Sequence, residues 1–316
     1  MRRELPRELP TITVVLVFAL GLFAFVPAFR THDNLTAVGE NAAFIGVMAC
    51  GEGLVILGAG LDLSVGSMMA LTSCTSALML SRGIAWPAAL IAGLATGALA
   101  GLINGLLITA RRLPPILTTL ATLLLFRHGI SLATQAKTFG PFPDAYNAVG
   151  AGWTPFILFI IIAAGFAVLQ GRTRLGRWTL AMGGSEQAAA LSAVPVQRVR
   201  CLAYVVSGLC AAIGGWIVMA FNNNAQSGVG QGYELNVIAA CVVGGIRITG
   251  GDGSIAGAAL GAVLIALLSD ALILTGRPEN QTGLFTGAVI LAAALIEGWR
   301  SRARLKSVAK IGAQAA

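Results

Sequence analysis

Residues 58–67 read GAGLDLSVGS and lie between two long apolar runs. The stretch contains three glycines, two serines and a single carboxylate, Asp62. Glycine permits tight turns and close backbone approaches, and an acid beside a helix N-terminus can accept hydrogen bonds from its unpaired N–H groups. The stretch therefore predicts an interrupted helix in which Asp62 supports the next helical segment. Direct contact between Asp62 and a solute is the alternative role.

The composition identifies the surroundings of this break as lipid. Of the 316 residues, 56% are hydrophobic and 11% are charged, whereas soluble domains carry about 25% charged residues. The mean hydropathy is +0.82. A soluble fold of this size cannot bury so much apolar surface, so the chain is expected to lie in a membrane. The five cysteines form no CxxC pair and the two histidines are far apart, which argues against a redox or metal site.

Ten apolar runs follow one another along the chain and predict an all-α, polytopic membrane protein. Only helices and closed barrels satisfy the backbone in lipid, and these runs lack the alternation of barrel strands. Most are long enough to cross the hydrocarbon layer, whereas those near 63–80 and 234–247 are predicted to be broken or re-entrant. The runs lie at roughly 11–29, 38–57, 63–80, 86–110, 116–134, 154–170, 198–221, 234–247, 254–275 and 282–298.

The distribution of basic residues predicts the orientation. Ten spans place both termini on one side, and cytoplasmic termini put roughly four times as many Lys and Arg inside as outside. This bias accounts for the net charge of +8 without any nucleic-acid partner. The loop 135–153 then lies outside, and the basic loop 171–197 lies in the cytoplasm.

An internal repeat relates the two halves of the chain. GLDLSV at 60–65 has a counterpart in GYELNV at 232–237, and each begins a short apolar segment. With five spans in each half, approximately 11–134 and 154–298, the second half is inverted relative to the first, as in many transporters. Chance is the competing explanation for so short a match. The residues assigned to the two helix breaks and their gating are Gly60, Asp62, Ser64, Gly66, Gly232 and Glu234.

Polar groups within the apolar runs are the candidates for a solute path, because they are costly to bury in a membrane. Glu52 lies in the middle of one run. Asn104 lies beside a row of glycines spaced by four in 86–110, a spacing that favours close helix packing. The amides at 222–224 suit hydrogen bonding to hydroxyl groups, and they equally suit an ordinary loop. The candidate path residues are Glu52, Asn104, Phe221, Asn222, Asn223, Asn224 and Asp270.

The cytoplasmic loop predicts a short helix. SEQAA at 185–189 places Ser185 before the first turn and Glu186 within it, which is typical of a capped helix start. A short helix on a basic cytoplasmic loop can dock a soluble partner, but by itself this pattern is a weak signal for one. The chain has no GxxxxGK[ST] phosphate loop, HExxH motif or GxSxG motif, so neither ATP binding of that kind nor catalysis is expected of it.

Four segments, in the same order, resemble the permease subunit of ribose-type bacterial sugar ABC importers, a group that includes autoinducer-2 and rhamnose permeases. The resemblance covers about residues 34–300. It is carried by NLTAVGENAAFIGVMACGEGLVILGAGLDLSVGS at 34–67, GLINGLLITARRLPPILTTLATLLLFRHGI at 101–130, GRWTLAMGGSEQAAALSAVPV at 176–196 and GYELNVIAACVVGGIRITGGDGSIAGAALGA at 232–262.

The resemblance implies an inner-membrane permease that translocates a monosaccharide or sugar-like solute. It implies a cytoplasmic ATPase that carries ATP and Mg, a periplasmic solute-binding protein, and a second permease subunit in a homodimer or heterodimer. This chain would itself hold no cofactor. The loop would contain the helix that couples the permease to the ATPase. The implied coupling residues are Gly176, Arg177, Gly183, Gly184, Ser185, Glu186, Ala188 and Ala189.

The sequence departs from the family pattern at several positions. Ser185 stands where the family has Asn, Glu52 where it usually has an uncharged residue, and Asp270 where Asn is common. These two acids indicate either a different substrate or a heterodimeric partner that supplies counter-charges. The alternative to an ATP-driven importer is a proton- or ion-coupled secondary transporter that uses Glu52, Asp62 and Asp270. A polytopic membrane enzyme is a further alternative, but the chain lacks a catalytic constellation to support it.

Overall fold

The computed structural model describes residues 8–276, 283–284, 287–288 and 291. Six helices in this part of the chain are long and apolar enough to cross a membrane. They are α2 (His32–Leu57), α4 (Trp86–Thr109), α5 (Pro115–Ala133), α7 (Thr154–Arg172), α10 (Val196–Asn222) and α12 (Ile255–Leu274). Shorter apolar helices are α1 (Leu9–Phe25), α3 (Val65–Ser81) and α11 (Tyr233–Val243). The expected run at 282–298 falls largely outside the described residues.

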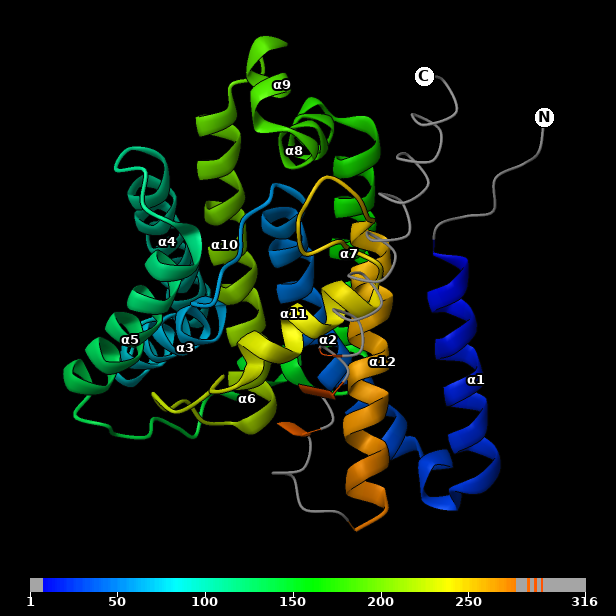
Figure 1. Cartoon of the computed structure of the whole chain (residues 1–316). Helices are drawn as coiled ribbons and strands as arrows, with labels where there is room; N and C mark the ends of the chain where they lie inside the picture. Colours follow the sequence, from blue (N-terminus) through cyan, green and yellow to red (C-terminus); the bar gives the residue numbers. More distant parts are fainter. Residues whose placement is uncertain (1–7, 277–282, 285–286, 289–290, 292–316) are drawn as a thin grey trace.

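The remaining elements are short and lie at the ends of the bundle. They are η1 (Pro27–Arg30), α6 (Asp144–Asn147), η2 (Ala148–Gly150), α8 (Arg174–Gly184) and α9 (Glu186–Leu191). Figure 1 shows α8 and α9 together at one end and α6 at the opposite end. At the α6 end, an isolated antiparallel bridge joins Phe139 to Ala225 and ties the loop 135–153 to the segment that follows α10. The two loops that the sequence singled out thus lie at opposite ends.

Helices α2 and α10 form the centre of the bundle. Helix α2 packs against α7, α10, α11 and α12, while α10 also packs against α3 and α4 (Figure 1). Almost the whole of α2 is buried inside the protein. It begins at His32, earlier than the expected run at 38–57, because the Thr31 hydroxyl accepts a hydrogen bond from the Asn34 N–H at 3.3 Å and caps a polar first turn.

The glycines spaced by four in α4 bring that helix very close to α10. A Cβ added at Gly97 would overlap the Gly208 carbonyl, and one added at Gly101 would overlap the Tyr204 carbonyl. Small residues allow such close backbone approaches, which carry much of the association between helices in membranes. The packing role expected for this glycine row is confirmed, and it holds Asn104 against the centre of the bundle.

Candidate functional site

The first helix break is the segment 58–64 between α2 and α3, and Asp62 organises it. One oxygen of Asp62, Oδ1, accepts hydrogen bonds from the backbone N–H of Ser64 at 3.0 Å and from the Ser64 hydroxyl at 2.6 Å. The other, Oδ2, accepts from the Ser207 hydroxyl of α10 at 3.1 Å. The carboxylate therefore supports Ser64, the residue that precedes α3, and anchors the break to a central helix. The bonded N–H belongs to Ser64 itself and not to the first turn of α3.

The break extends into a fully buried polar cluster, which we call the polar node: Glu52, Asp62, Ser64, Asn104 and Ser207. The Asp62 N–H donates to Glu52 Oε1 at 3.0 Å, and Asn104 Nδ2 donates to the Ser64 hydroxyl at 2.8 Å. All five side chains are inaccessible to solvent. Glu52 Oε2 and Asn104 Oδ1 have no hydrogen-bond partner among the described residues. The node thus joins α2, the break, α4 and α10 and retains two unused acceptors.

The second break precedes α11 and is built differently. Glu234 lies inside the first turn of α11, so Glu234 Oε1 accepts from the N–H of Gly232, which precedes the helix, at 3.3 Å. Equivalence to Asp62 in the repeat predicts that Glu234 accepts from N–H groups that follow it, whereas its bond runs back to Gly232. A Cβ at Gly66 of α3 would overlap the Glu234 carboxylate and the Gly230 carbonyl. Gly66 is therefore the point at which the beginnings of α3 and α11 meet.

Helices α8 and α9 form the predicted element at the end of the bundle. The Ser185 hydroxyl accepts from the Ala188 N–H at 3.3 Å, which confirms the capped helix start. Glu186 pairs with Arg200 at the start of α10, with an N–O distance of 2.6 Å. The hydrogen bond from Arg200 holds the pKa of Glu186 below its usual range. Leu191, at the end of α9, is 90% exposed, so α9 presents an uncovered tip.

The end of α8 rests on the end of α2, immediately before the first break. A Cβ at Gly183 would overlap the Leu57 carbonyl, and that carbonyl accepts a hydrogen bond from the Gly251 N–H at 2.9 Å. Gly251 belongs to the loop between α11 and α12, which follows the second break. We call this contact between Leu57, Gly183 and Gly251 the glycine junction. It links the α8–α9 element to the flank of the first break and to the loop between α11 and α12.

The remaining candidate path residues lie apart from the polar node. Asn223 Oδ1 accepts from the Phe142 N–H at 2.8 Å and from Asn147 Nδ2 at 3.0 Å, and so fastens the loop 135–153 to the end of α10. Asn224 Nδ2 donates to the Asn222 carbonyl at 2.9 Å. The structure therefore brings Glu52 and Asn104 together and places the residues 221–224 at the α6 end.

Asp270 of α12 occupies a third location. Its Oδ2 accepts from Asn34 Nδ2 of α2 at 3.0 Å, and the residue is 8% exposed. It lies outside the polar node, beside the first turn of α2. No group of three or more His, Cys, Asp and Glu residues is gathered within the described ranges in a way that could hold a metal ion.

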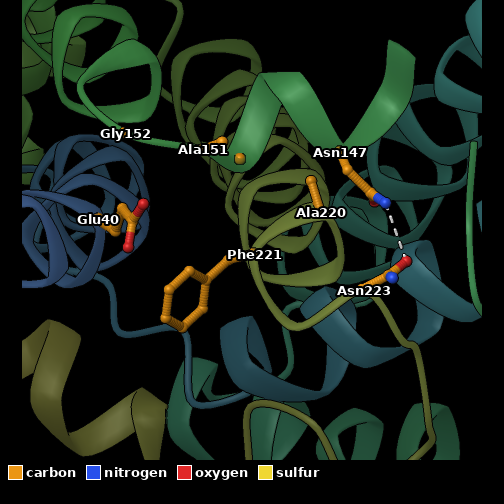
Figure 2. Close-up of a pocket in the computed structure, with 8 residues that line it drawn as sticks. Glu40, Asn147, Ala151, Gly152, Ala220, Phe221 and Asn223 are labelled. Carbon is orange, nitrogen blue, oxygen red and sulfur yellow. Dashed lines mark hydrogen bonds between the residues drawn. The ribbon is translucent and has the colours of Figure 1, made fainter. Parts of the chain in front are cut away.

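A cavity of about 310 Å³ opens at the α6 end, between α2, the α6–η2 turn and the end of α10. Figure 2 shows the Glu40 carboxylate and the Phe221 ring on its wall. Glu40 is not among the candidate path residues selected from the sequence. The signal was available, because Glu40 lies two turns inside α2 and within the run expected at 38–57.

Comparison with known proteins identifies the family. Residues 34–294 match the family described as the permease component of the branched-chain amino acid transport system. The chain belongs to this permease family. The permease is 33% identical to the ribose import permease protein of Escherichia coli (strain K12) over 92% of its own length and 93% of the relative. No solved structure matches it.

Further relatives cover a similar extent of the permease. The autoinducer 2 import system permease protein of Enterobacter sp. (strain 638) is 32% identical, over 92% of this chain and 87% of the relative. A probable ABC transporter permease protein of Sinorhizobium fredii is 34% identical, over 90% and 86%. Membership makes the protein a transport permease rather than an enzyme, and it disfavours the ion-coupled alternative. The relatives are named for different solutes, so the family alone does not specify the solute.

Proposed function

We propose that the permease is the membrane-spanning subunit of an ATP-binding-cassette importer for a monosaccharide or sugar-like solute, such as ribose, rhamnose or autoinducer-2. A cytoplasmic ATPase with ATP and Mg drives it, a periplasmic binding protein delivers the solute, and a second permease subunit completes the path. The protein lies in the bacterial inner membrane with both termini in the cytoplasm. The observation that carries the proposal is the α8–α9 element, which protrudes at one end (Figure 1) and contacts both the flank of the first break and the loop between α11 and α12.

Ten spans in two inverted halves are part of this proposal, and the pairing of helices supports them. Helix α2 packs on α11 and α12, and α10 packs on α3 and α4. Helix α3 packs on α4 as α11 packs on α12. Exchanging α2 with α10, α3 with α11 and α4 with α12 therefore converts each of these contacts into another. Inverted repeats allow one half to move against the other during alternating access.

The glycine junction supplies a mechanical route from the ATPase to the solute path. When the ATPase closes on ATP, it displaces α9 and, through the short turn at Ser185, also α8. Gly183 then presses on the Leu57 carbonyl, and the same movement shifts the Gly251 N–H bonded to it. Backbone in direct contact cannot absorb such a displacement as a flexible side chain can. The break at 58–64 consequently moves against α4 and α10.

Two adjacent glycines provide a matched test. A Cβ at Gly183 would overlap backbone atoms, whereas a Cβ at Gly184 would have no neighbour within 4 Å. We expect Gly183→Ala to lose most of the ATP hydrolysis stimulated by the loaded binding protein in proteoliposomes, and Gly184→Ala to retain it. Copurification of the ATPase with both variants checks that the complex assembles. Equal stimulation in the two variants would contradict the proposed coupling route.

A second experiment separates the proposal from ion-coupled transport. The permease alone, reconstituted in vesicles with an imposed proton gradient, should not accumulate radiolabelled D-ribose, L-arabinose or L-rhamnose. Addition of the ATPase, ATP, Mg and the binding protein should start uptake of the solute that the binding protein carries. Uphill uptake by the permease alone, abolished by an uncoupler, would refute the proposal.

A further inference from the structure

The cavity at the α6 end has the size and position of a solute site. Its volume of about 310 Å³ is at the lower end of the range of roughly 300–1,000 Å³ for small-molecule pockets. The described residues on its walls come from three parts of the chain: Glu40 of α2, the turn from Asn147 to Gly152, and the end of α10 with Phe221 and Asn223. Figure 1 places these elements at the end away from α8 and α9.

The polar atoms of the cavity are mainly hydrogen-bond acceptors. Glu40 is only 7% exposed, and its carboxylate has a backbone hydrogen bond with Gly152. Asn147 Oδ1 is buried and has no hydrogen-bond partner among the described residues. Asn223 uses its Oδ1 for the loop, which leaves its amide nitrogen to donate. A ligand with several hydroxyl groups can satisfy such a set, because each hydroxyl both donates and accepts.

Phe221 adds an apolar surface beside these polar groups. Its side chain is 44% exposed although it is a large aromatic residue, and Figure 2 shows its ring and the Glu40 carboxylate facing the same space. None of the described residues that line the cavity is a Lys or an Arg. An anionic ligand would therefore meet the Glu40 carboxylate without any compensating charge, which disfavours phosphate and carboxylate ligands. The combination of acceptors and an aromatic face suits a neutral sugar ring.

We propose that this cavity is an outer binding site for a neutral monosaccharide, in which Glu40 and Asn147 accept hydrogen bonds from hydroxyl groups and Phe221 packs on the apolar face of the ring. The site receives the solute before it enters the path, and this assignment rests on the importer function proposed above. A small ammonium cation attracted by Glu40 is the competing ligand, and the experiment separates the two.

Protection of an introduced cysteine measures occupancy directly. Ala151 is exposed and lines the cavity, so Ala151→Cys should react with a membrane-impermeant maleimide. The unsubstituted permease, in which four of the five cysteines are buried, gives the background. At a ligand concentration about five times its dissociation constant, labelling slows about sixfold. We expect this protection from at least one of D-ribose, L-arabinose and L-rhamnose, and none from methylammonium or inorganic phosphate.

Variants of the lining residues test the assigned contacts. In the Ala151→Cys background, Glu40→Gln and Phe221→Ala should each abolish sugar protection, while Phe221→Trp should retain it. Phe25→Ala is the matched control, because Phe25 at the end of α1 is 86% exposed and does not line the cavity. Sugar protection that persists in both Glu40→Gln and Phe221→Ala overturns the assignment. Protection by methylammonium alone, or by no probe, also overturns it.

Failure of the outer-site proposal can be distinguished from failure of the importer function. The same preparations are assayed for ATP hydrolysis stimulated by the ATPase and the loaded binding protein. Normal stimulation without sugar protection of Ala151→Cys rejects the outer site and leaves the importer function standing. Absent stimulation in the unsubstituted complex rejects the importer function itself.

Discussion

Replacing Asp62 tests whether the polar node holds the first break together. Its carboxylate accepts from the Ser64 N–H at 3.0 Å, from the Ser64 hydroxyl at 2.6 Å and from the Ser207 hydroxyl at 3.1 Å. Asp62→Ala removes all three acceptors from a site without solvent access. Serine hydroxyls can turn toward helix carbonyls. The Ser64 N–H cannot reorient, so it is left buried and unpaired.

The magnitude follows from these bonds. A buried hydrogen bond contributes about 0.5–1.5 kcal/mol, and an unsatisfied buried donor costs about 1–3 kcal/mol. We therefore expect Asp62→Ala to lower the free energy of unfolding by about 3–5 kcal/mol. Asp62→Asn keeps an oxygen for both bonds from Ser64, and its amide can donate to the Ser207 hydroxyl. For this variant we expect a loss of about 1–2 kcal/mol.

The assay is denaturant unfolding of the purified permease in detergent, followed by circular dichroism. Asp33→Ala is the matched control, because the Asp33 side chain is fully exposed in the first turn of α2. It should lose less than about 1 kcal/mol. If Asp62→Ala is as stable as Asp62→Asn, the hydrogen bonds of the node do not maintain the break, and the reasoning is refuted.

Three further predictions concern other parts of the bundle. Gly97→Ala should lower the free energy of unfolding by about 1–3 kcal/mol, because the added methyl group forces α4 away from the Gly208 carbonyl. The control is Gly129→Ala, in open space on α5, which should be neutral or stabilising by up to about 1 kcal/mol. Equal effects of the two variants in the same unfolding assay would contradict the close packing of α4 on α10. Arg200 lowers the pKa of Glu186 in the folded protein. The ion pair therefore stabilises α9 fully at pH values above the unfolded pKa of Glu of about 4.3, and this stabilisation is lost as the pH falls through the lowered folded-state pKa. At neutral pH, Glu186→Gln should thus exchange the amide hydrogens of α9 faster than the unsubstituted permease. This difference in exchange rate should vanish in strong acid. A difference that does not depend on pH would exclude the ion pair as its cause. Arg127 donates to the carbonyls of Ser227 and Val229, so Arg127→Gln should make the loop 223–232 more sensitive to protease. The control Arg82→Gln changes an exposed residue and should leave cleavage of the loop unchanged. If Arg127→Gln also leaves cleavage unchanged, Arg127 does not hold this loop.

Local features of the sequence predicted the elements of this protein. Composition and run length identified a helical membrane protein, because lipid imposes helices wherever apolar runs are long. The support of Ser64 by Asp62 spans two residues, and the cap of α9 by Ser185 spans three. Contacts of such short range follow from the local chain alone. The starts of α3 and α9 were therefore open to prediction.

Only the tertiary structure decided which elements meet. The partners of Asp62, Gly66 and Gly183 lie far away in the sequence, at Ser207, Glu234 and Leu57. In a soluble helix, the apolar stripe shows which face packs. In lipid, the outward face is as apolar as the packed one, so the sequence does not distinguish them. For the same reason the sequence does not show that Glu40 lines a cavity. That position follows only from the packing of α6, η2 and α10 beside it. The sequence by itself determined that the chain crosses a membrane, where it breaks and which family it resembles, whereas packing decided the polar node, the glycine junction and the outer cavity.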